Sequence, residues 1–221
     1  MRLGQHFLVN EETIKKFVSY VDLSIRPLIE IGGGKGNITK HLNPDIIIEL
    51  DERFSNYLKN LVIADARYLP VIRGQIVSSL PYYITFDFFE EIVKLDGIKR
   101  LSLILQLDFI KKVVNEPTYI SYLLNYYFKI EIKDVLPPWF FKPRPKVFSS
   151  IVIFQRIRTN TNKVNELLKC ISRYRNKKIV NALELCGATN IKNKDIFNKR
   201  VRDYKPCQVL ELLSLINTNY V

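Results

Sequence analysis

The sequence is poor in the residues that form metal sites and disulfide frameworks. Its 221 residues include two histidines, His6 and His41, and three cysteines, Cys170, Cys186 and Cys207. The cysteines are odd in number, widely spaced and without a C-x-x-C pair, which argues against a disulfide framework or a zinc site. We therefore expect no metal ion. We also expect buried, small apolar cysteines in a reducing compartment, and hence a cytoplasmic protein.

Long apolar runs are also missing. Runs such as LSLIL at 101–105 fall far short of the about 20 residues that a transmembrane helix needs. The N-terminal stretch, MRLGQHFLVNEETIKK, has no apolar core long enough for a secretory signal. With 47% hydrophobic and 25% charged residues, the composition is that of a soluble globular protein. We expect no membrane partner.

Acidic residues are scarce only in the last third of the chain. Residues 1–138 hold 17 Lys and Arg against 17 Asp and Glu, whereas residues 139–221 hold 17 against 5. The whole net charge of +12 therefore belongs to the C-terminal part. This asymmetry indicates a neutral working domain followed by one that binds a polyanion, although a solvated, lysine-rich helical tail would have the same composition.

Short apolar runs alternate with amphipathic segments through the first two-thirds of the chain. The runs expected to be buried strands are 26–33, 45–50, 61–66, 74–80 and 101–107. The segments expected to be helices between them are 11–21, 52–61 and 86–95. This order predicts an α/β fold with a parallel, Rossmann-like sheet covered on both faces.

The chain changes character near residue 158. Two further strands are expected near 127–135 and 149–157, and the proline-rich segment between them leaves no room for a crossover helix, so they should pair antiparallel. Beyond them the sequence has helical periodicity with many basic residues. We therefore predict two domains, 1–158 and a small basic helical domain, 159–221.

Unusual residues follow three of the predicted strands. The first runs from Glu30 into a glycine loop with Gly32, Gly34 and Gly36. Glycines allow a tight turn and a close approach of a ligand to the backbone. Ligands of open parallel sheets bind at the carboxyl ends of the strands. A glycine loop alone is also compatible with a dinucleotide or a flavin.

The next two strand ends narrow the choice of ligand. Glu49 is positioned to accept hydrogen bonds from ribose hydroxyls, and Asp65 from an exocyclic amine. Together with the loop they indicate an adenosine-containing cofactor. The loop lacks the G-x-G-x-x-G spacing of a pyrophosphate site, which favours S-adenosylmethionine over NAD.

The fourth strand ends in Ser79, Leu80, Pro81 and Tyr82. A target amine has to be held so that its lone pair points at the methyl group of the donor. The Ser79 side chain and a neighbouring backbone carbonyl supply two acceptors for its N–H groups, and Tyr82 can stack on the base. No strong general base is needed, because the methyl donor is already activated and the work is alignment.

Seven segments in order resemble the ribosomal RNA adenine N6-dimethyltransferase family, which includes the small-subunit enzymes and the erythromycin-resistance methyltransferases. They are GQHFL (4–8), IEIGGGKGNIT (29–39), IELD (48–51), ADA (64–66), SLPYYIT (79–85), FKPRPKVFSS (141–150) and RYRNKKIVNAL (173–183). They extend over nearly the whole chain. The resemblance implies that 1–158 is the S-adenosylmethionine-binding methyltransferase domain and that 159–221 binds RNA.

The resemblance also implies roles for individual residues. Gln5, His6 and Leu8 would lie at the methionine end of the cofactor. Phe141 would pack against the target adenine from the side opposite Tyr82. Such a pocket takes a flipped or single-stranded base, as RNA loops present it.

Basic residues expected to bind RNA fall in two groups. Lys142, Arg144 and Lys146 lie on a proline-stiffened loop beside the predicted pocket and should contact phosphates. The second group is Arg173, Arg175, Lys177 and Lys178. Its members would lie on more than one helical face, so about half of them should point into solvent.

The predicted function is S-adenosylmethionine-dependent N6-methylation of adenines in a small-subunit ribosomal RNA loop, by a monomer acting on RNA or on a pre-ribosomal particle. Ser79 and His6 each replace a usual Asn of the family, and Gly33 replaces a usual Pro. The departure at Ser79 leaves open a non-catalytic assembly factor that keeps the fold. Methylation of large-subunit RNA or DNA is a further alternative, and an NAD oxidoreductase is disfavoured by the loop spacing.

Overall fold

The computed structural model describes residues 6–188, 191 and 198–216. Gln5, one of the predicted cofactor residues, lies outside this part of the chain. The chain divides into two compact units. The first is made of residues 1–108 and 129–157, and the second of 109–128 and 158–221.

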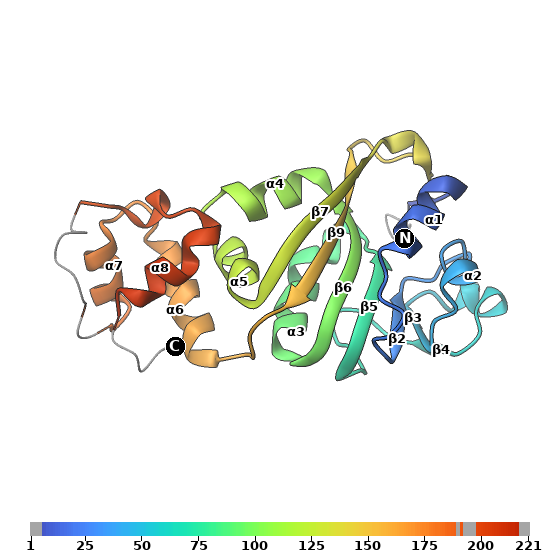
Figure 1. The fold of residues 1–221 in the computed structure, drawn as a ribbon, viewed down its shortest axis with the longest axis horizontal. Coiled ribbons are helices and arrows are strands. Elements are labelled where there is room, and N and C mark those ends of the chain that lie inside the picture. The colour runs from blue at the N-terminus through green and yellow to red at the C-terminus, as the bar shows by residue number, and fades with distance from the viewer. Residues whose placement is uncertain (1–5, 189–190, 192–197, 217–221) are drawn as a thin grey trace. The chain divides into compact units, whose positions relative to one another are not determined.

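The first unit is built on a seven-stranded sheet of order β4-β3-β2-β5-β6-β9-β7 (Figure 1). Its strands are β2 (Leu28–Ile31), β3 (Ile46–Glu49), β4 (Leu61–Ile63), β5 (Arg73–Ser79), β6 (Gly97–Gln106), β7 (Phe128–Leu136) and β9 (Ser149–Arg156). Strands β2, β3, β4, β5 and β6 are parallel to one another, and β9 is antiparallel to β6. The predicted α/β fold with a mostly parallel sheet is confirmed, and β7 and β9 are neighbours, as expected.

Helices cover both faces of this sheet. Buried side chains of α1 (Glu11–Ser19) and α2 (Thr39–Leu42) share one hydrophobic cluster with Val77, Ile104 and Ile151 of the sheet. Helix α3 (Thr85–Lys94) lies on the opposite face, because its Phe89 contacts Phe154 of β9, whose ring centroid is 5.0 Å away. Phe154 and Ile151 are an odd number of residues apart and so point to opposite faces of the strand.

The segment after β3 differs from its prediction. A helix was expected over 52–61, and the structure has a 3₁₀ helix over Glu52–Tyr57. The Asp51 side chain caps it by accepting from the Arg53 backbone N–H at 3.1 Å. Because β4 begins at Leu61, only a short, tight element fits between the two strands.

A second, two-stranded sheet joins the N-terminal segment to the segment before β9. It pairs β1 (Phe7–Leu8) antiparallel with β8 (Phe141–Lys142). The 3₁₀ helix η3 (Pro138–Phe140) precedes β8, and the Val9 N–H donates to the Phe140 carbonyl at 2.8 Å. Through these bonds the N-terminal segment and residues 137–142 hold each other in place.

The second unit is helical. Its helices are α4 (Leu107–Asn115, which starts at the end of the first unit), α5 (Tyr119–Tyr127), α6 (Asn162–Arg173), α7 (Ile179–Leu185) and α8 (Val209–Ser214). Short 3₁₀ turns lie at Val201–Asp203 and Pro206–Gln208. The fully buried Tyr122 of α5 donates its hydroxyl to the carbonyls of Val201 and Tyr204, at 2.9 and 2.7 Å.

Residues 109–128 group with the C-terminal helices, whereas the sequence analysis placed them in the first domain. The contacts of Tyr122 join segments that are far apart in the sequence, and local periodicity cannot indicate them. The division into two folding domains at residue 158 stays a prediction.

The expectation for the cysteines is wrong. Cys170 and Cys186 form a disulfide bond, and Cys207 is exposed rather than buried. Their sequence spacing gave no sign of this pair. The packing of α6 and α7 brings the two Cα atoms to 5.8 Å, within the range that a disulfide needs.

Replacing Tyr122 with phenylalanine tests the packing of the second unit. Tyr122→Phe keeps the ring and removes both hydrogen bonds, so we expect the free energy of unfolding in urea to fall by about 1–3 kcal/mol. The matched control is Tyr68→Phe, since the Tyr68 side chain is 77% exposed. The control should stay within about 0.5 kcal/mol of the wild type. Equal losses of unfolding free energy in the two variants would contradict a stabilising role for the hydrogen bonds of Tyr122.

Candidate active site

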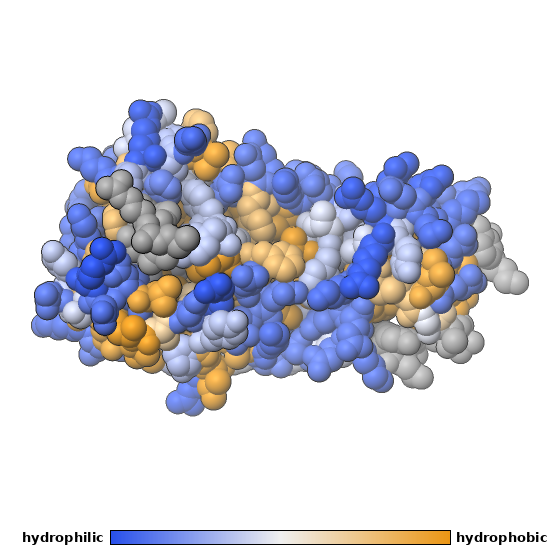
Figure 2. Space-filling view, turned by 180° about the vertical axis from the view of Figure 1, so that it is seen from behind, coloured by the Kyte–Doolittle hydropathy of each residue, from blue (hydrophilic) through white to orange (hydrophobic). Residues whose placement is uncertain are grey.

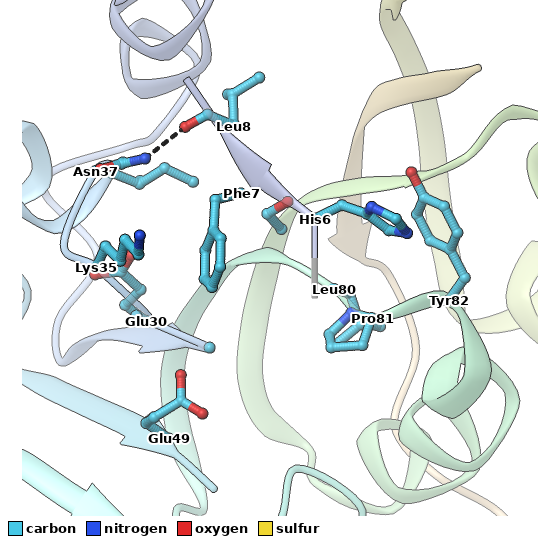
Figure 3. Close-up of a pocket in the computed structure, with 14 residues that line it drawn as sticks. His6, Phe7, Leu8, Glu30, Lys35, Asn37, Glu49, Leu80, Pro81 and Tyr82 are labelled. Atoms are coloured by element: carbon cyan, nitrogen blue, oxygen red, sulfur yellow. Dashed lines mark hydrogen bonds between the residues drawn. The ribbon is translucent and has the colours of Figure 1, made fainter. Parts of the chain in front are cut away.

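Two adjoining pockets lie at the carboxyl ends of the parallel strands. The first is lined by residues that include His6, Leu8, Glu30, Ser79 and Tyr82. The second is lined by residues that include Leu50, Asp65, Ala66 and Arg67. The pockets adjoin because three residues line both, namely Gly32, Glu49 and Pro81. Figure 3 shows Glu30 and Glu49 on one side of the first pocket and His6 and Tyr82 on the other.

The glycine loop after β2 borders both pockets through Gly32, and Gly33 lines the first. Gly34 has a φ of +51°, and a Cβ atom at this position would lie 2.6 Å from the Phe7 ring. Only glycine fits this conformation and this contact without strain. Gly34 and Gly36 line neither pocket, so their predicted contact with the cofactor stays a prediction.

Glu49, at the end of β3, holds the loop in place. Its carboxylate accepts from the backbone N–H of Gly34 and from that of Asp51, each at 3.0 Å. The residue is 7% exposed. A carboxylate has about four acceptor positions, so Glu49 can still accept from a ligand hydroxyl.

Glu30 is the most perturbed acid of the site. The residue is 2% exposed, and its Oε2 atom has no hydrogen-bond partner among the described residues. Burial raises the pKa of Glu30 to about 7, and the nearby charge of Glu49 acts in the same direction. Glu30 is therefore a buried acceptor beside the pocket that a cationic ligand group can satisfy.

Asp65 lies where the sequence placed it, but it has a partner. The Arg67 backbone N–H donates to it at 2.9 Å, and the Arg67 guanidinium donates to both carboxylate oxygens at 2.6–3.1 Å. These bonds from Arg67 hold the pKa of Asp65 below its ordinary value. Asp65 is thus a charged acceptor in the second pocket, and Arg67 is a site residue that the sequence analysis missed.

The segment Ser79 to Tyr82 forms the other side of the first pocket. Strand β5 ends at Ser79, and Pro81 caps the 3₁₀ helix Tyr82–Ile84. The Tyr82 hydroxyl lies 2.5 Å from the Ser149 hydroxyl, and burial raises the pKa of Tyr82. The Tyr82 ring is therefore fixed at its far end.

His6 lies against Tyr82 rather than standing apart as a surface histidine. The ring centroids are 6.2 Å apart with an interplanar angle of 29° (Figure 3). His6 Nδ1 donates to the Pro143 carbonyl at 2.7 Å. The structure thus brings His6 together with the predicted target segment.

Phe141 does not line either pocket. It is 2% exposed, pairs with Leu8 across the small sheet, and belongs to the cluster under α1. Because its side chain faces the core, the aromatic ring found beside Tyr82 is His6. The role predicted for Phe141 at the target base stays a prediction.

The basic residues predicted to bind RNA are exposed in both units. Lys142 is the last residue of β8, and Arg144 and Lys146 lie on the loop between β8 and β9 of the first unit. In the second unit, Arg173, Arg175, Lys177 and Lys178 are exposed around the turn between α6 and α7.

A second basic segment pairs with this turn. The Ile179 N–H donates to the Lys199 carbonyl, and the N–H groups of Val201 and Arg202 donate to Lys177 and Arg175. The exposed cations Lys199, Arg200 and Arg202 thereby join the turn in one basic ribbon, residues 173–178 and 199–202. The run of cations at 199–202 was the available signal, and the sequence analysis did not use it.

The residues of the two pockets fit S-adenosylmethionine. The acceptor Asp65 and apolar neighbours suit an adenine in the second pocket, and Glu49, shared by both pockets, suits the ribose. The orphaned Glu30 oxygen suits the cationic methionine end in the first pocket. The fold and the pockets define an S-adenosylmethionine-dependent methyltransferase of the Rossmann-like class.

Comparisons with known proteins agree with this class. Over residues 1–218, the sequence matches the family described as ribosomal RNA adenine dimethylase, and the chain belongs to that family. S-adenosylmethionine is accordingly its cofactor, and the protein is a ribosomal RNA adenine methyltransferase.

Named relatives and solved structures are similar to this chain in sequence or in fold. Ribosomal RNA small subunit methyltransferase A of Sulfurihydrogenibium sp. (strain YO3AOP1) is 29% identical over 203 residues, which are 79% of this chain and 76% of the relative. A dimethyladenosine transferase from Plasmodium falciparum has a similar structure, with a TM-score of 0.73 at 20% identity over 95% and 96% of the two chains. The 23S rRNA methyltransferase ErmE shares the fold, with a TM-score of 0.69 at 20% identity over 96% and 100%.

The part of the chain that the structure describes has neither a candidate membrane span nor a candidate metal site. Within residues 6–188, 191 and 198–216, no helix is long and apolar enough to cross a membrane. No group of three or more His, Cys, Asp or Glu in the same ranges could hold a metal ion.

The raised pKa of Glu30 predicts a pH dependence of stability. Between about pH 4.5 and pH 7 the folded protein keeps a proton that the unfolded chain has lost, so the free energy of unfolding should fall as pH rises through this window. Glu30→Gln removes the titration and should be more stable than the wild type at pH 8, by up to roughly 3 kcal/mol. Urea unfolding at pH 4.5, 6 and 8 measures the difference.

The control for this experiment is Glu116→Gln, which changes an exposed glutamate of the second unit. Its unfolding free energy should follow that of the wild type at every pH. If the unfolding free energy of Glu30→Gln changes with pH as that of the wild type does from pH 4.5 to 8, Glu30 does not hold its proton in the folded state.

Proposed function

We propose that this protein dimethylates the N6 atoms of adenines in a small-subunit ribosomal RNA loop during ribosome assembly, acting as a monomer on RNA or on a pre-ribosomal particle. The observation that carries the proposal is the junction of the two pockets at Gly32, Glu49 and Pro81. Ser79 to Tyr82 line the first pocket, and Pro81 also lines the second, which supports a target base held next to the cofactor. The small-subunit substrate is supported by the name of the Sulfurihydrogenibium relative.

The chain's own residues have to align the base rather than activate it. When bound, S-adenosylmethionine supplies a methyl group that is already activated on sulfur. Ser79 and a neighbouring backbone carbonyl accept the N–H bonds of the adenine amine, which turns its lone pair out of the ring plane. Tyr82, fixed by Ser149, offers a ring face to the base. Holding the reactants in this geometry accounts for the catalysis.

The target adenine has to leave its stack to enter this pocket. The first pocket lies between the acidic side, with Glu30 and Glu49, and the rings of His6 and Tyr82 (Figure 3). Enzymes that act on a base take it out of the helix or use single-stranded substrate. Loops of ribosomal RNA provide unstacked adenines at little cost.

The basic ribbon supplies phosphate attraction without sequence specificity. Its seven cations, in residues 173–178 and 199–202, are exposed, and binding through them should weaken as salt rises. Specificity would then come from the shape of the RNA and from the target pocket.

Removing the Ser79 hydroxyl should slow methyl transfer. Ser79→Ala deletes one acceptor for the target amine, and we expect the single-turnover rate to fall about 10- to 100-fold. The matched control is Ser78→Ala, because Ser78 lines neither pocket and its buried hydroxyl donates to the Ile31 carbonyl. The control should keep its rate.

Replacing Ser79 with the asparagine that is usual in the family tests whether a longer acceptor side chain at this position speeds the reaction. Ser79→Asn keeps an acceptor and extends its reach, so it should raise the rate and the share of dimethyladenosine. An unchanged rate and product pattern would show that position 79 does not limit the reaction.

The ribbon predicts a change in salt dependence. The double variant Lys177→Ala and Lys178→Ala should bind RNA with a weaker salt dependence. The negative slope of the log binding constant against log salt concentration should become smaller in magnitude by about 1–2, as expected for two lost phosphate contacts. Replacing the exposed Lys94 and Lys99 of the first unit is the control and should leave the slope unchanged. If both double variants had the same slope, the basic ribbon would not contact the RNA.

The decisive experiment is methyl transfer from labelled S-adenosylmethionine to under-methylated small ribosomal subunits. The RNA is then digested and its nucleosides are resolved. Label in N6,N6-dimethyladenosine is the expected result. If the protein binds the cofactor and the subunit but transfers no label, it is an assembly factor that keeps the fold, which the departure at Ser79 would then explain. Label found only in large-subunit RNA would show that the substrate is large-subunit rather than small-subunit RNA.

A further inference from the structure

The single tryptophan of the chain lies on the surface. Trp139 is 59% exposed and Phe148 is 45% exposed. The face of the molecule in Figure 2 is largely hydrophilic with separate hydrophobic patches. The two rings contact each other edge to face, with centroids 6.5 Å apart. The Arg144 guanidinium lies over the Trp139 ring at 5.5 Å. We call Trp139, Arg144 and Phe148 the aromatic platform.

The platform is attached to the target side of the first pocket. Phe148 immediately precedes Ser149, which contacts the Tyr82 hydroxyl at 2.5 Å. On the other side, the platform loop carries Pro143, whose carbonyl accepts from His6. Both rings that border the target position, those of His6 and Tyr82, are therefore bonded to the segment that carries the platform.

The backbone around the platform is fixed. The Phe148 carbonyl accepts from the Leu107 N–H at 2.9 Å, and the Phe140 carbonyl, next to Trp139, accepts from Val9 at 2.8 Å. The exposed rings thus stand on a backbone that is bonded at both ends. A rigid aromatic surface binds a flat ligand at a lower cost in conformational entropy.

The charge around the platform suits a polyanion. Residues 137–150 contain three cations and no acidic residue. Lys142, Arg144 and Lys146 are exposed, and within the part of the chain that the structure describes none of them forms an ion pair. Aromatic rings interleaved with cations that have no acidic partner are the arrangement by which proteins hold single-stranded nucleic acid.

We propose that the aromatic platform binds a nucleotide that flanks the target adenine. Its base stacks on the Trp139 ring, with the Phe148 ring beside it, and Arg144 and Lys142 contact its phosphates. The inference rests on the proposed function, and it adds a second binding position for the RNA strand. Stacking accepts any base, so the platform fixes the strand and leaves the choice of adenine to the pocket.

The tryptophan provides a direct signal for the test. Full-length protein is titrated with the single-stranded oligoadenylate rA10, and binding is followed by Trp139 emission and by anisotropy of labelled rA10. We expect saturable quenching, with the dissociation constant that anisotropy gives. Trp139→Ala and Phe148→Ala should each raise this constant about fivefold or more, the lower limit for one stacked base. Trp139→Phe, which keeps a ring, should recover most of the affinity.

The control is Tyr68→Ala, which removes a 77% exposed ring that lines neither pocket. It should bind rA10 as the wild type does. Thermal melting and cofactor calorimetry of each variant confirm that fold and cofactor site are intact. The proposal would be overturned if all variants had the same dissociation constant for rA10 by anisotropy and rA10 did not change the tryptophan emission of the wild type. A wild type that does not bind rA10 would also overturn it.

Methyl transfer to small subunits, run with the same variants, separates the two proposals. If the wild type methylates the subunit and the platform variants show a raised KM with little change in kcat, the platform is supported. If they bind rA10 normally but show a raised KM for subunits, the platform contacts ribosomal protein and the RNA assignment fails. A wild type that transfers no methyl group refutes the proposed function instead.

Discussion

The site depends on one carboxylate, that of Glu49. It accepts from Gly34 in the loop after β2 and from Asp51 in the segment after β3, and so ties together two neighbouring strand ends. Gly34 can make this bond because its positive φ turns the loop back against Phe7, where a side chain would collide. The two pockets meet at this point, since Glu49 lines both of them.

The parallel sheet explains why the remaining groups gather here. Strands β2, β3 and β5 are parallel, so Glu30, Glu49 and Ser79 all reach the same edge from different parts of the sequence. The same edge holds two acids at different pKa values. Burial raises the pKa of Glu30 to about 7, whereas the hydrogen bonds from Arg67 lower the pKa of Asp65 and keep it charged. A cofactor that is cationic at one end and carries an amine at the other matches this order.

The target side is held from two directions. Ser149, at the start of β9, fixes the Tyr82 ring, and the Pro143 carbonyl fixes the His6 ring. The small sheet of β1 and β8 connects these two contacts. No residue of segment 137–148 lines either pocket, but its Pro143 carbonyl holds His6, which lines the first. In our proposal the exposed rings of this segment hold the RNA strand beside the site.

Much of this arrangement was predictable from the sequence, because it follows local patterns. The alternation of short apolar runs gave the strands, and the rule that ligands bind at the carboxyl ends of parallel strands gave Glu49, Asp65 and Ser79. Contacts over long sequence distances were not predictable. The stacking of His6 on Tyr82 and the burial of Phe141 depend on how the two sheets meet.

Other features were missed for the same reason. The disulfide between Cys170 and Cys186 depends on the packing of α6 against α7, and the grouping of residues 109–128 with the second unit depends on Tyr122. The Asp65–Arg67 pair is close in sequence, but it forms only because the turn after β4 directs both side chains to the same place. Residue spacing alone does not show such a turn.

The most direct test of the account is calorimetric titration of S-adenosylhomocysteine into the wild type and into Glu49→Ala. The account predicts one site in the wild type and a loss of affinity of at least about tenfold in the variant, since hydrogen bonds to a charged group contribute about 1.5–3 kcal/mol each. The fold should survive, because the sheet does not depend on this side chain. Equal affinity in the two proteins would contradict the central role of Glu49 and the placement of the cofactor at the strand ends.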